Sequence, residues 1–318
     1  MRLATLRDGT PDGALVVVSA DGARALGAGS SLIDALTRWS EIEPSLADLA
    51  ARVAAGKGDP VDPALLAAPL PRSWQWLDGS AFATHGELMQ IAFGLDPIDR
   101  DRPLMYQGLS DRFYGPADSI PLPSAADGID FEGEFGVIVD AVPMGTSAER
   151  AAAHIRLVVQ INDWSLRAIA PVEMKTGFGW IQAKPACSMA PFAVTPDELG
   201  ADWHDGRVCA ELTVEWNGAR FGCVNGREMA FSFPELVAHA ARTRDLVAGT
   251  IIGSGTVSNA DYATRGSACI SERRAIEIIA HGAPQTAFMA FGDHVRMEAR
   301  TSHGSAPFGA IDQVVVQA

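Results

Sequence analysis

The sequence predicts a strand-rich α+β protein in which a small N-terminal domain, residues 1–70, precedes a larger domain, residues 71–318. Short apolar runs between Gly- and Pro-containing turns indicate strands, and helical spacing recurs at a few places between them. Residues 56–72 contain several prolines and little periodicity, which predicts a linker between the two parts. A chain of 318 residues, 47% of them apolar, is long enough to bury a sizeable core.

The net charge of the chain and the lack of apolar targeting patterns in its sequence limit the classes of partner that we expect. The formal net charge of -14 argues against nucleic acid or an anionic membrane, and an anionic substrate would need local cations to hold it. No apolar run reaches the length of a membrane span, and the first residues lack the apolar core of a signal peptide. The four cysteines are scattered without a close metal-type pair, so we expect them to be reduced in a cytoplasmic protein.

The N-terminal part predicts one strand and two helices. Residues 14–19 form an apolar run between two Asp-Gly turns. Apolar residues at helical spacing between Leu32 and Trp39 indicate the first helix. The second is expected to start at Pro44 and to end before Gly56, because proline is favoured in a first helical turn and glycine after a last one. This part carries no evident chemistry, so we expect it to serve packing and positioning.

The candidate functional residues lie in the part of the chain that follows the linker. Apolar residues at helical spacing follow His85 and place it near the start of a short helix. Residues 130–139 predict an acidic strand, and residues 155–163 predict a buried strand with Asp163 at its C-terminal tip.

The remaining elements follow from turn and capping signals. Asn217-Gly218 between two alternating runs predicts a hairpin. A capping box beginning at Ser232 predicts a helix that continues to about Thr243. The tail from Arg274 onward alternates in the manner of strands separated by Gly and Pro turns.

Glu132 and Glu134 are the most informative pair. Side chains two apart on a strand share a face, and two carboxylates so close repel each other unless one is protonated or a cation lies between them. Hard divalent ions prefer such oxygen ligands. The alternative is that both glutamates line a solvated strand face.

In chain order, Glu132-Gly-Glu134 is followed by Asn162-Asp163-Trp164-Ser165, then Arg167, Lys184 and a Gly-Thr loop at Thr256. From about Trp74 to the C-terminus this pattern resembles the fumarylacetoacetate hydrolase family, metal-dependent enzymes that cleave carbon–carbon bonds in diketo acids. The resemblance implies a mixed β-sheet roll with a small N-terminal domain, and a homodimer.

The resemblance implies that Glu132, Glu134 and Asp163 coordinate a divalent ion. Asp78 stands seven residues before His85, as a further aspartate ligand does in larger family members; the alternative is a turn residue in Asp78-Gly79. An all-carboxylate set suits Mg²⁺ or Mn²⁺, with Ca²⁺ as a further candidate, better than Zn²⁺.

The resemblance also implies catalytic roles. His85 would take a proton from water, and Lys184 and Arg167 would supply positive charge for a departing enolate; their alternative is ion pairing with the carboxylates. A carboxylate should orient His85. We prefer Glu272, expected on a strand, to Glu87, which is two residues after the histidine.

Substrate contacts are implied for Tyr106 and Thr256, and a hydroxyl or backbone contact near the metal for Ser188. Two positions depart from the larger members, where a glutamine and a tyrosine contact substrate. Here they are Ala170 and Met174, which argues against fumarylacetoacetate itself as the substrate.

These observations favour a hydrolase that cleaves a small-molecule acylpyruvate-type diketo acid or 1,3-diketone. Decarboxylation or isomerisation of a 2-oxo acid on the same scaffold is the first alternative. A metal- or ligand-binding protein without turnover is the second alternative. It is favoured only because the family's glutamate position, aligned from Thr256, falls on Ile270, two residues before Glu272.

Overall fold

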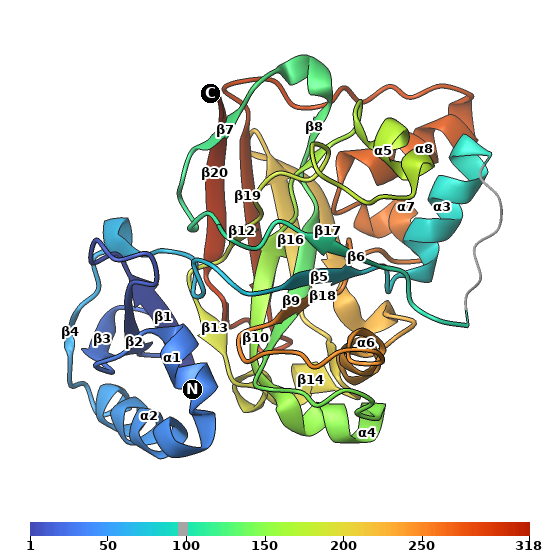
Figure 1. The fold of residues 1–318 in the computed structure, drawn as a ribbon. Helices are drawn as coiled ribbons and strands as arrows, with labels where there is room; N and C mark the ends of the chain where they lie inside the picture. Colours follow the sequence, from blue (N-terminus) through green and yellow to red (C-terminus); the bar gives the residue numbers. More distant parts are fainter. Residues whose placement is uncertain (95–100) are drawn as a thin grey trace.

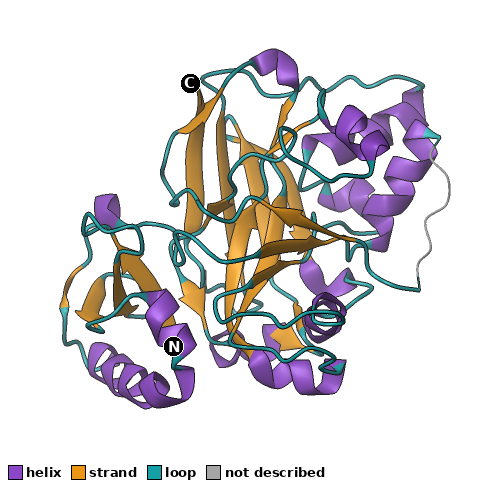
Figure 2. Ribbon diagram, viewed as in Figure 1, coloured by secondary structure: helices purple, strands orange, loops and turns teal. Residues whose placement is uncertain are grey.

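The computed structural model describes residues 1–94 and 101–318 and confirms the strand-rich α+β prediction (Figures 1 and 2). Its largest sheet has eleven strands, which are β1 (Arg2–Leu6), β2 (Ala14–Val18), β3 (Arg24–Gly27), β4 (Asp59–Pro60), β5 (Trp76–Gly79), β6 (Met105–Gly108), β9 (Gly133–Val139), β10 (Ile155–Asn162), β12 (Ser188–Met189), β13 (Ala193–Val194) and β18 (Ile251–Gly253). Their order is β4-β3-β2-β1-β13-β10-β9-β18-β5-β6, and β12 pairs with β10.

A second sheet has five strands in the order β17-β16-β19-β20-β7. Its members are β7 (Ile120–Leu122), β16 (Glu211–Trp216), β17 (Ala219–Asn225), β19 (His294–Arg300) and β20 (Ala310–Gln317). The predicted hairpin is confirmed, since Asn217 and Gly218 join β16 to β17 and both have positive φ, 52° and 76°. Two short pairs complete the strands, β8 (Ile129–Asp130) with β11 (Ser165–Leu166) and β14 (Trp203–His204) with β15 (Arg207–Val208).

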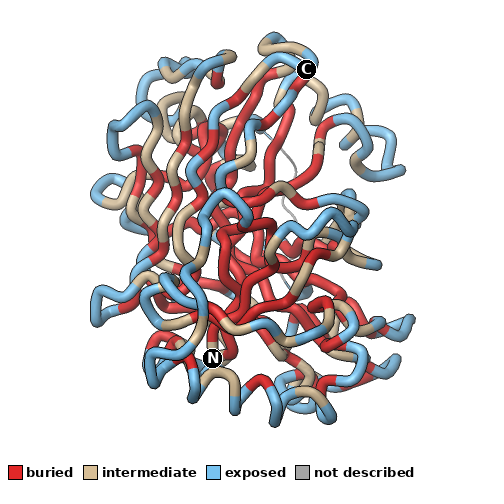
Figure 3. Tube along the Cα trace, turned by 90° about the vertical axis from the view of Figure 1, so that its left-hand side faces the viewer, coloured by how far each residue is buried: buried red, intermediate tan, exposed pale blue. Residues whose placement is uncertain are grey.

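The main core lies between the two sheets, where buried strands run through the middle of the molecule (Figure 3). Phe135 and Val137 of β9 belong to the same buried cluster as Leu212 and Val214 of β16. Gly133 faces the same way, since a β-carbon there would lie 2.9 Å from Leu212. The opposite face of β9 is left for the even-numbered residues, as the strand period requires.

The N-terminal segment is continuous with this architecture. Strand β1 pairs with β13, and Leu3 and Leu15 share a buried cluster with Ile138 and Ile161 of the central strands. The expected linker is mostly irregular, but Leu70 within it is buried in the same cluster. The division into domains at residue 70 therefore remains a prediction from the sequence.

The helices are α1 (Leu32–Thr37), α2 (Trp39–Ala54), α3 (Ala83–Phe93), α4 (Ala148–Ala151), α5 (Ala170–Thr176), α6 (Phe233–Ala240), α7 (Tyr262–Arg265) and α8 (Ile270–His281). Helix α3 packs against α8, on the right in Figure 1. Within the described part of the chain, no helix is both long and apolar enough to cross a membrane.

The predicted start of the second helix is wrong, because α2 begins at Trp39 and contains Pro44. Trp39 and Leu46, seven residues apart, are both buried on the face that packs on the sheet, and Pro44 is exposed. Burial of that face holds the helix together across the hydrogen bond that proline cannot donate.

The C-terminal predictions hold in part. The capping box is confirmed, since the Ser232 N–H donates to Glu235 at 2.7 Å, although α6 ends at Ala240. The strand expected from Arg274 is wrong at its start, because residues 270–281 form α8, which ends at Gly282 with φ 81°. Strands β19 and β20 lie beyond it.

Candidate active site

Four strands from one run of five neighbours, β10-β9-β18-β5-β6, place the predicted polar residues at one point of the large sheet. Asp163 directly follows β10, Glu134 lies on β9, and Asp78 lies on β5, which β18 separates from β9. Tyr106 lies opposite Asp78 on the neighbouring strand β6. The even-numbered face of β9 points toward this place, so the strand alternation inferred from the sequence is confirmed for Glu134.

Asp78, Glu134 and Asp163 form a buried group that we call the acidic cluster. One carboxylate oxygen from each lies within 4.8 Å of the other two. The three side chains are 7%, 1% and 0% exposed, in that order. Three carboxylates so close and so dry repel each other strongly when ionised.

Glu134 shows this repulsion most clearly. Among the described residues, neither of its carboxylate oxygens has a hydrogen-bond partner. Burial, and then the charges of Asp78 and Asp163, raise the pKa of Glu134 well above its usual value. Burial and then the charge of Asp163 raise the pKa of Asp78 in the same way.

The acidic cluster fits a hard divalent cation. It offers carboxylate oxygens and neither sulfur nor imidazole, which is the donor set that Mg²⁺, Mn²⁺ and Ca²⁺ prefer. The unpartnered oxygens of Glu134 are the strongest local sign, because a buried carboxylate is normally hydrogen-bonded or bound to a cation.

Glycines position Asp78. The Gly255 N–H donates to Oδ1 of Asp78 at 2.9 Å. A β-carbon on Gly253 would lie 2.3 Å from the same oxygen, so only glycine fits at the facing position of β18. The turn reading of Asp78-Gly79 is incorrect, because both residues lie within strand β5.

Glu132 lies beside the acidic cluster, within a set that we call the ion-pair network: Asp130, Glu132, Arg167 and Lys184. The Lys184 ammonium bridges the two groups, since Nζ lies 2.6 Å from Glu132 and 2.5 Å from Asp163. Arg167 lies 3.0 Å from Glu132, and the hydroxyls of Ser165 and Thr256 donate to the two oxygens of that glutamate.

The charges in the ion-pair network compensate one another. Burial alone would raise the pKa of Glu132, but Arg167 and Lys184 outweigh it, and the net pKa is well below its usual value. Burial would likewise lower the pKa of Lys184, but Asp163 and Glu132 raise it. Glu132 is therefore ionised and Lys184 charged at neutral pH. The ion pairing that the sequence left open for Lys184 and Arg167 is present.

Asp130 connects this network to α8. Its carboxylate accepts hydrogen bonds from the backbone N–H groups of Ile270 and Ser271, at 2.7 and 2.9 Å, and from Arg167 at 2.9 Å. The first turn of α8 is thus fixed by a buried anion, which is favourable at a helix N-terminus. Burial raises the pKa of Asp130, and Arg167 opposes that shift.

His85 and Glu272 meet where α3 packs on α8. The Nδ1–H of His85 donates to Oε2 of Glu272 at 2.8 Å, and the Glu272 side chain is fully buried. The expectation that Glu272 lies on a strand is wrong, because it lies in the first turn of α8. The alternative partner, Glu87, is exposed on α3.

Tyr106 and Thr256 contact the carboxylates directly. The Tyr106 hydroxyl donates to Oδ2 of Asp163 at 2.6 Å, and Thr256 donates to Oε2 of Glu132. Burial, followed by the charge of Asp163, raises the pKa of Tyr106 well above its usual value, so the phenol stays protonated. Both hydroxyls therefore act as donors at the site.

Three other residues were singled out from the sequence. Ser188 lies next to the site, and Ala170 and Met174 lie on helix α5. Ser188 accepts a hydrogen bond from Trp164 Nε1 at 2.9 Å, and its strand pairs opposite Asn162. Ala170 and Met174 lie on α5, where Met174 is exposed. The inference that these two residues argue against fumarylacetoacetate as the substrate stays a prediction.

Three residues at the site were not predicted: Asp130, Cys187 and Cys269. Asp130 precedes Glu132 by two residues, as Glu132 precedes Glu134. This spacing in the sequence could have indicated that Asp130 also belongs to the site. Cys187 Sγ lies 3.0 Å from Oδ1 of Asp163, and Cys269 caps α8 by accepting the Glu272 N–H at 3.3 Å. No sequence spacing relates these two thiols to the carboxylates, and all four cysteines are free.

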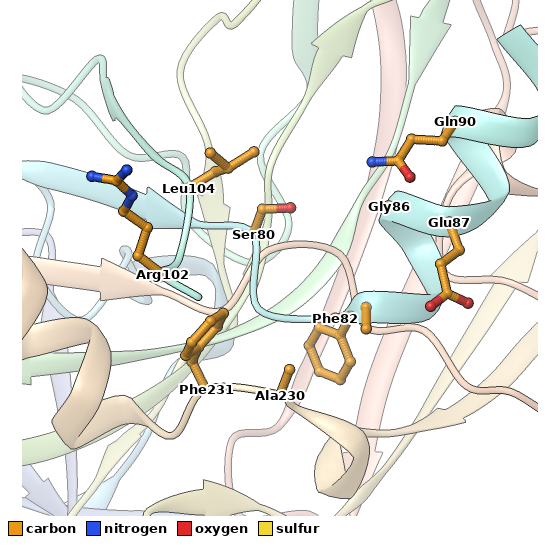
Figure 4. Close-up of a pocket in the computed structure, with 10 residues that line it drawn as sticks. Ser80, Phe82, Gly86, Glu87, Gln90, Arg102, Leu104, Ala230 and Phe231 are labelled. Carbon is orange, nitrogen blue, oxygen red and sulfur yellow. The ribbon is translucent and has the colours of Figure 1, made fainter. Parts of the chain in front are cut away.

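A separate hollow of about 100 Å³ lies behind α3 (Figure 4). Ala83, Gly86, Glu87 and Gln90 line it from α3, and at 100° per residue their positions lie about 100–160° around the helix from His85. Its other lining residues are Ser80, Phe82, Arg102, Leu104, Ala230 and Phe231. The acidic cluster does not line it, so we assign it no part in the chemistry.

Two family descriptions match the chain. "Fumarylacetoacetate (FAA) hydrolase C-terminal" matches residues 75–316, and "Fumarylacetoacetase N-terminal domain 2" matches residues 1–72. Together they cover the segments that contain every residue of the site described above.

Three known proteins illustrate the similarity. A 2,4-didehydro-3-deoxy-L-rhamnonate hydrolase of Sphingomonas sp. (strain SKA58) is 27% identical over 157 residues, 48% of this chain and 52% of that protein. The mitochondrial oxaloacetate tautomerase FAHD2A of Homo sapiens is 25% identical over 168 residues, 50% and 49% of the two chains. The chain thus spans about half the length of these relatives. The structure of maleylpyruvate hydrolase from Sphingobium sp. SYK-6, in complex with manganese(II) ion and pyruvate, superposes over 100% of both chains with a TM-score of 0.67 at 16% identity.

Proposed function

The chain belongs to the fumarylacetoacetate hydrolase family, and from that premise we propose that it is a divalent-metal-dependent hydrolase of a diketo acid or 1,3-diketone. Family members include hydrolases and tautomerases, so membership alone leaves the reaction open. The observation that carries the hydrolase proposal is the His85–Glu272 pair, because only hydrolysis requires a base for water.

The acidic cluster is where we propose that Mg²⁺ or Mn²⁺ binds, held by Asp78, Glu134 and Asp163, with Glu132 adjacent. Manganese in a structurally similar maleylpyruvate hydrolase supports this choice of ion. A bound ion would supply Lewis-acid polarisation of the substrate's carbonyl oxygens. The cluster's oxygen donors and the unpartnered Glu134 support the proposal from this chain's own residues.

His85 is the proposed general base. Glu272 accepts the Nδ1–H, which fixes the ring and leaves the lone pair on Nε2 to take a proton from water. The buried carboxylate also stabilises the imidazolium that results. Glu272 contacts His85 although it is offset from the family's glutamate position. The offset therefore no longer favours a binding protein without turnover.

Lys184 and Tyr106 are the proposed donors to developing negative charge. Lys184 stays charged between Glu132 and Asp163, and the Tyr106 phenol stays protonated beside it, with Nζ 5.2 Å from the ring centre. An enolate oxygen placed here would meet a cation and a hydroxyl donor in a dry site. Arg167 would act on the enolate less directly, because its guanidinium group forms ion pairs with Asp130 and Glu132.

Product analysis tests the proposal. Diketo acids are incubated with the Mg²⁺- or Mn²⁺-loaded protein and the products are measured by mass spectrometry. Hydrolysis yields two acids from one substrate. Release of CO₂ would indicate a decarboxylase, and an unchanged mass with altered absorbance would indicate a tautomerase or isomerase.

The variant His85→Gln tests whether His85, on α3, is the general base. We expect the hydrolytic rate to fall about 10²–10⁴-fold, as loss of a general base does. Glu87→Gln is the matched control, because Glu87 lies on the same helix but is exposed and lines the hollow behind it. Equal rates for the His85 variant and the wild type would contradict water activation by His85.

A further inference from the structure

A second set of potential ligands lies beside the acidic cluster and has different chemistry. A ring nitrogen of His85, a carboxylate oxygen of Glu132 and Sγ of Cys269 lie within 4.8 Å of one another. They come from α3, from the residue before β9, and from the residue before α8. We call these three residues the sulfur site.

The donor set of the sulfur site suits a softer ion than the acidic cluster does. One nitrogen, one oxygen and one sulfur are ligands that Zn²⁺ accepts in four-coordinate sites, often with water as the fourth ligand. Ligands of such an ion, with bonds of about 2.0–2.3 Å, lie about 3.5 Å apart, so the side chains would need to draw together by no more than about 1.3 Å. An all-carboxylate site favours Mg²⁺ or Mn²⁺, so the two sites divide ions by softness.

His85 already has the environment of a zinc-binding histidine. Metal-bound histidines usually donate their second ring N–H to a carboxylate, which fixes the tautomer and increases the basicity of the ligand nitrogen. Glu272 accepts the Nδ1–H of His85 at 2.8 Å and is fully buried. The nitrogen left for an ion is therefore Nε2.

Cys269 lies at a helix N-terminus, but burial and then the charge of Asp130 raise the pKa of its thiol well above the usual value, so a bound ion would have to displace the thiol proton. Its sulfur accepts the Glu272 N–H at the N-terminus of α8, a helix of 12 residues. Helix N-termini stabilise the thiolate, which is the form that binds metal. Ion binding would replace the thiol proton with a metal–sulfur bond and release that proton to solvent, with no change of oxidation state.

The surrounding charges permit a cation. Arg167 and Lys184 lie beside Glu132 and oppose one. Asp130, Glu132 and Glu272 contribute three carboxylates to the same region, and the Cys269 thiolate would contribute a fourth negative charge. The balance is negative, as a divalent ion requires.

We propose that His85, Glu132 and Cys269 form a second metal site for a thiophilic divalent ion such as Zn²⁺, and that an ion bound there inhibits the enzyme. Its inhibitory effect rests on the proposed function, because the ion would occupy the lone pair with which His85 activates water. The existence of the site does not rest on that function, and it is measurable without any substrate.

Cobalt(II) provides the direct test. The full-length protein is saturated with Mg²⁺ and then titrated with Co²⁺, and the near-ultraviolet charge-transfer absorption of a cobalt–thiolate bond is recorded. We expect this absorption in the wild type and its loss in Cys269→Ser. Serine is a good helix N-cap, so this variant keeps the capping of α8 and should fold.

Cys187→Ser is the matched control, because Cys187 is the other buried thiol beside the carboxylates and contacts Asp163. The absorption should persist in this variant. Loss of the absorption in Cys187→Ser, or its persistence in Cys269→Ser or His85→Gln, would overturn the proposed site.

Zinc binding and inhibition form the second arm. Calorimetric Zn²⁺ affinity should fall by about 10–100-fold in Glu272→Gln, which removes the carboxylate behind His85, and by more in Cys269→Ser. Zn²⁺ should inhibit turnover of the Mg²⁺ enzyme, and Cys269→Ser should relieve that inhibition. If cobalt binds as expected but Zn²⁺ does not inhibit, the site stands and the role of His85 in catalysis fails.

Discussion

Glu132, the residue before β9, and Glu134, within β9, lie two residues apart but in opposite electrostatic surroundings. Glu132 is surrounded by donors, with Lys184 at 2.6 Å and Arg167 at 3.0 Å, and its pKa is lowered despite burial. Glu134 has no hydrogen-bond partner among the described residues, and burial beside Asp78 raises its pKa.

The difference separates two ways of keeping a carboxylate in a protein interior. In the ion-pair network the chain supplies the compensating charges itself. In the acidic cluster the chain does not supply the compensating charge, and a bound cation would have to do so. Without a cation, the carboxyl groups with raised pKa values tend to stay protonated. The two regions should therefore respond differently to mutation, metal and pH.

The largest expected effect on stability is that of Glu132→Gln. Removing this carboxylate leaves Lys184 and Arg167 with one buried anionic partner fewer, which should lower the free energy of unfolding of the metal-free protein by about 3 kcal/mol. Urea denaturation in EDTA measures it, with the exposed Glu87→Gln as control. A loss as small as that of the control would mean that the network is not compensating Glu132.

Glu134→Gln should act almost entirely through metal. In EDTA the free energy of unfolding should stay the same or rise, because an unpartnered buried carboxyl is replaced by a neutral group. We expect Mg²⁺ to stabilise the wild type by about 2.7 kcal/mol at a hundredfold excess over Kd, and this gain should be absent in the variant. Retention of that gain would place the ion elsewhere.

Asp130→Asn tests the link from the network to the helix that carries Glu272. Asparagine cannot accept all three hydrogen bonds with full charge, so we expect a loss of about 1–3 kcal/mol in unfolding free energy. The first turn of α8 should loosen, and kcat should fall more than KM rises. Asp127→Asn, three residues earlier and half-buried, is the control. An equal response of the two variants would remove Asp130 from the positioning of Glu272.

The metal-free protein should also show a pH dependence of its stability. Because the pKa values of Glu134 and Asp78 are raised on folding, the folded state keeps protons that the unfolded chain releases near pH 4–4.5. The free energy of unfolding should therefore fall as pH rises from that value toward the folded pKa values, by up to about 1.4 kcal/mol per pH unit for each proton.

Glu132 acts in the opposite direction, since its lowered pKa contributes stability that is lost only as pH falls below its unfolded value. The two contributions occupy different pH ranges. Denaturation of the wild type and of Glu134→Gln from pH 4.5 to 8 in EDTA separates them, and parallel curves would contradict a raised pKa for Glu134.

The local patterns of the sequence were sufficient for several elements. The Asn217-Gly218 turn, the capping box at Ser232 and the strand alternation at Glu134 all depend on neighbours in the chain, and each is present. The acidic strand expected over residues 130–139 is divided into β8, which ends at Asp130, and β9, which begins at Gly133. The helix over residues 270–281 overturns the strand that family spacing implies for Glu272, although a glycine directly after residue 281 is itself a signal for a helix end.

By itself the sequence determined the family, the strand-rich α+β class and the strand face on which Glu134 lies, since these follow from residue order and from a period of two. Only the tertiary structure decided which carboxylates meet, because strand β18 and helix α8 bring Asp78 and Glu272 to the site from residues far away in the chain. The partners of a buried charge set its pKa, and those partners are fixed by packing between strands and helices, not by spacing along the chain.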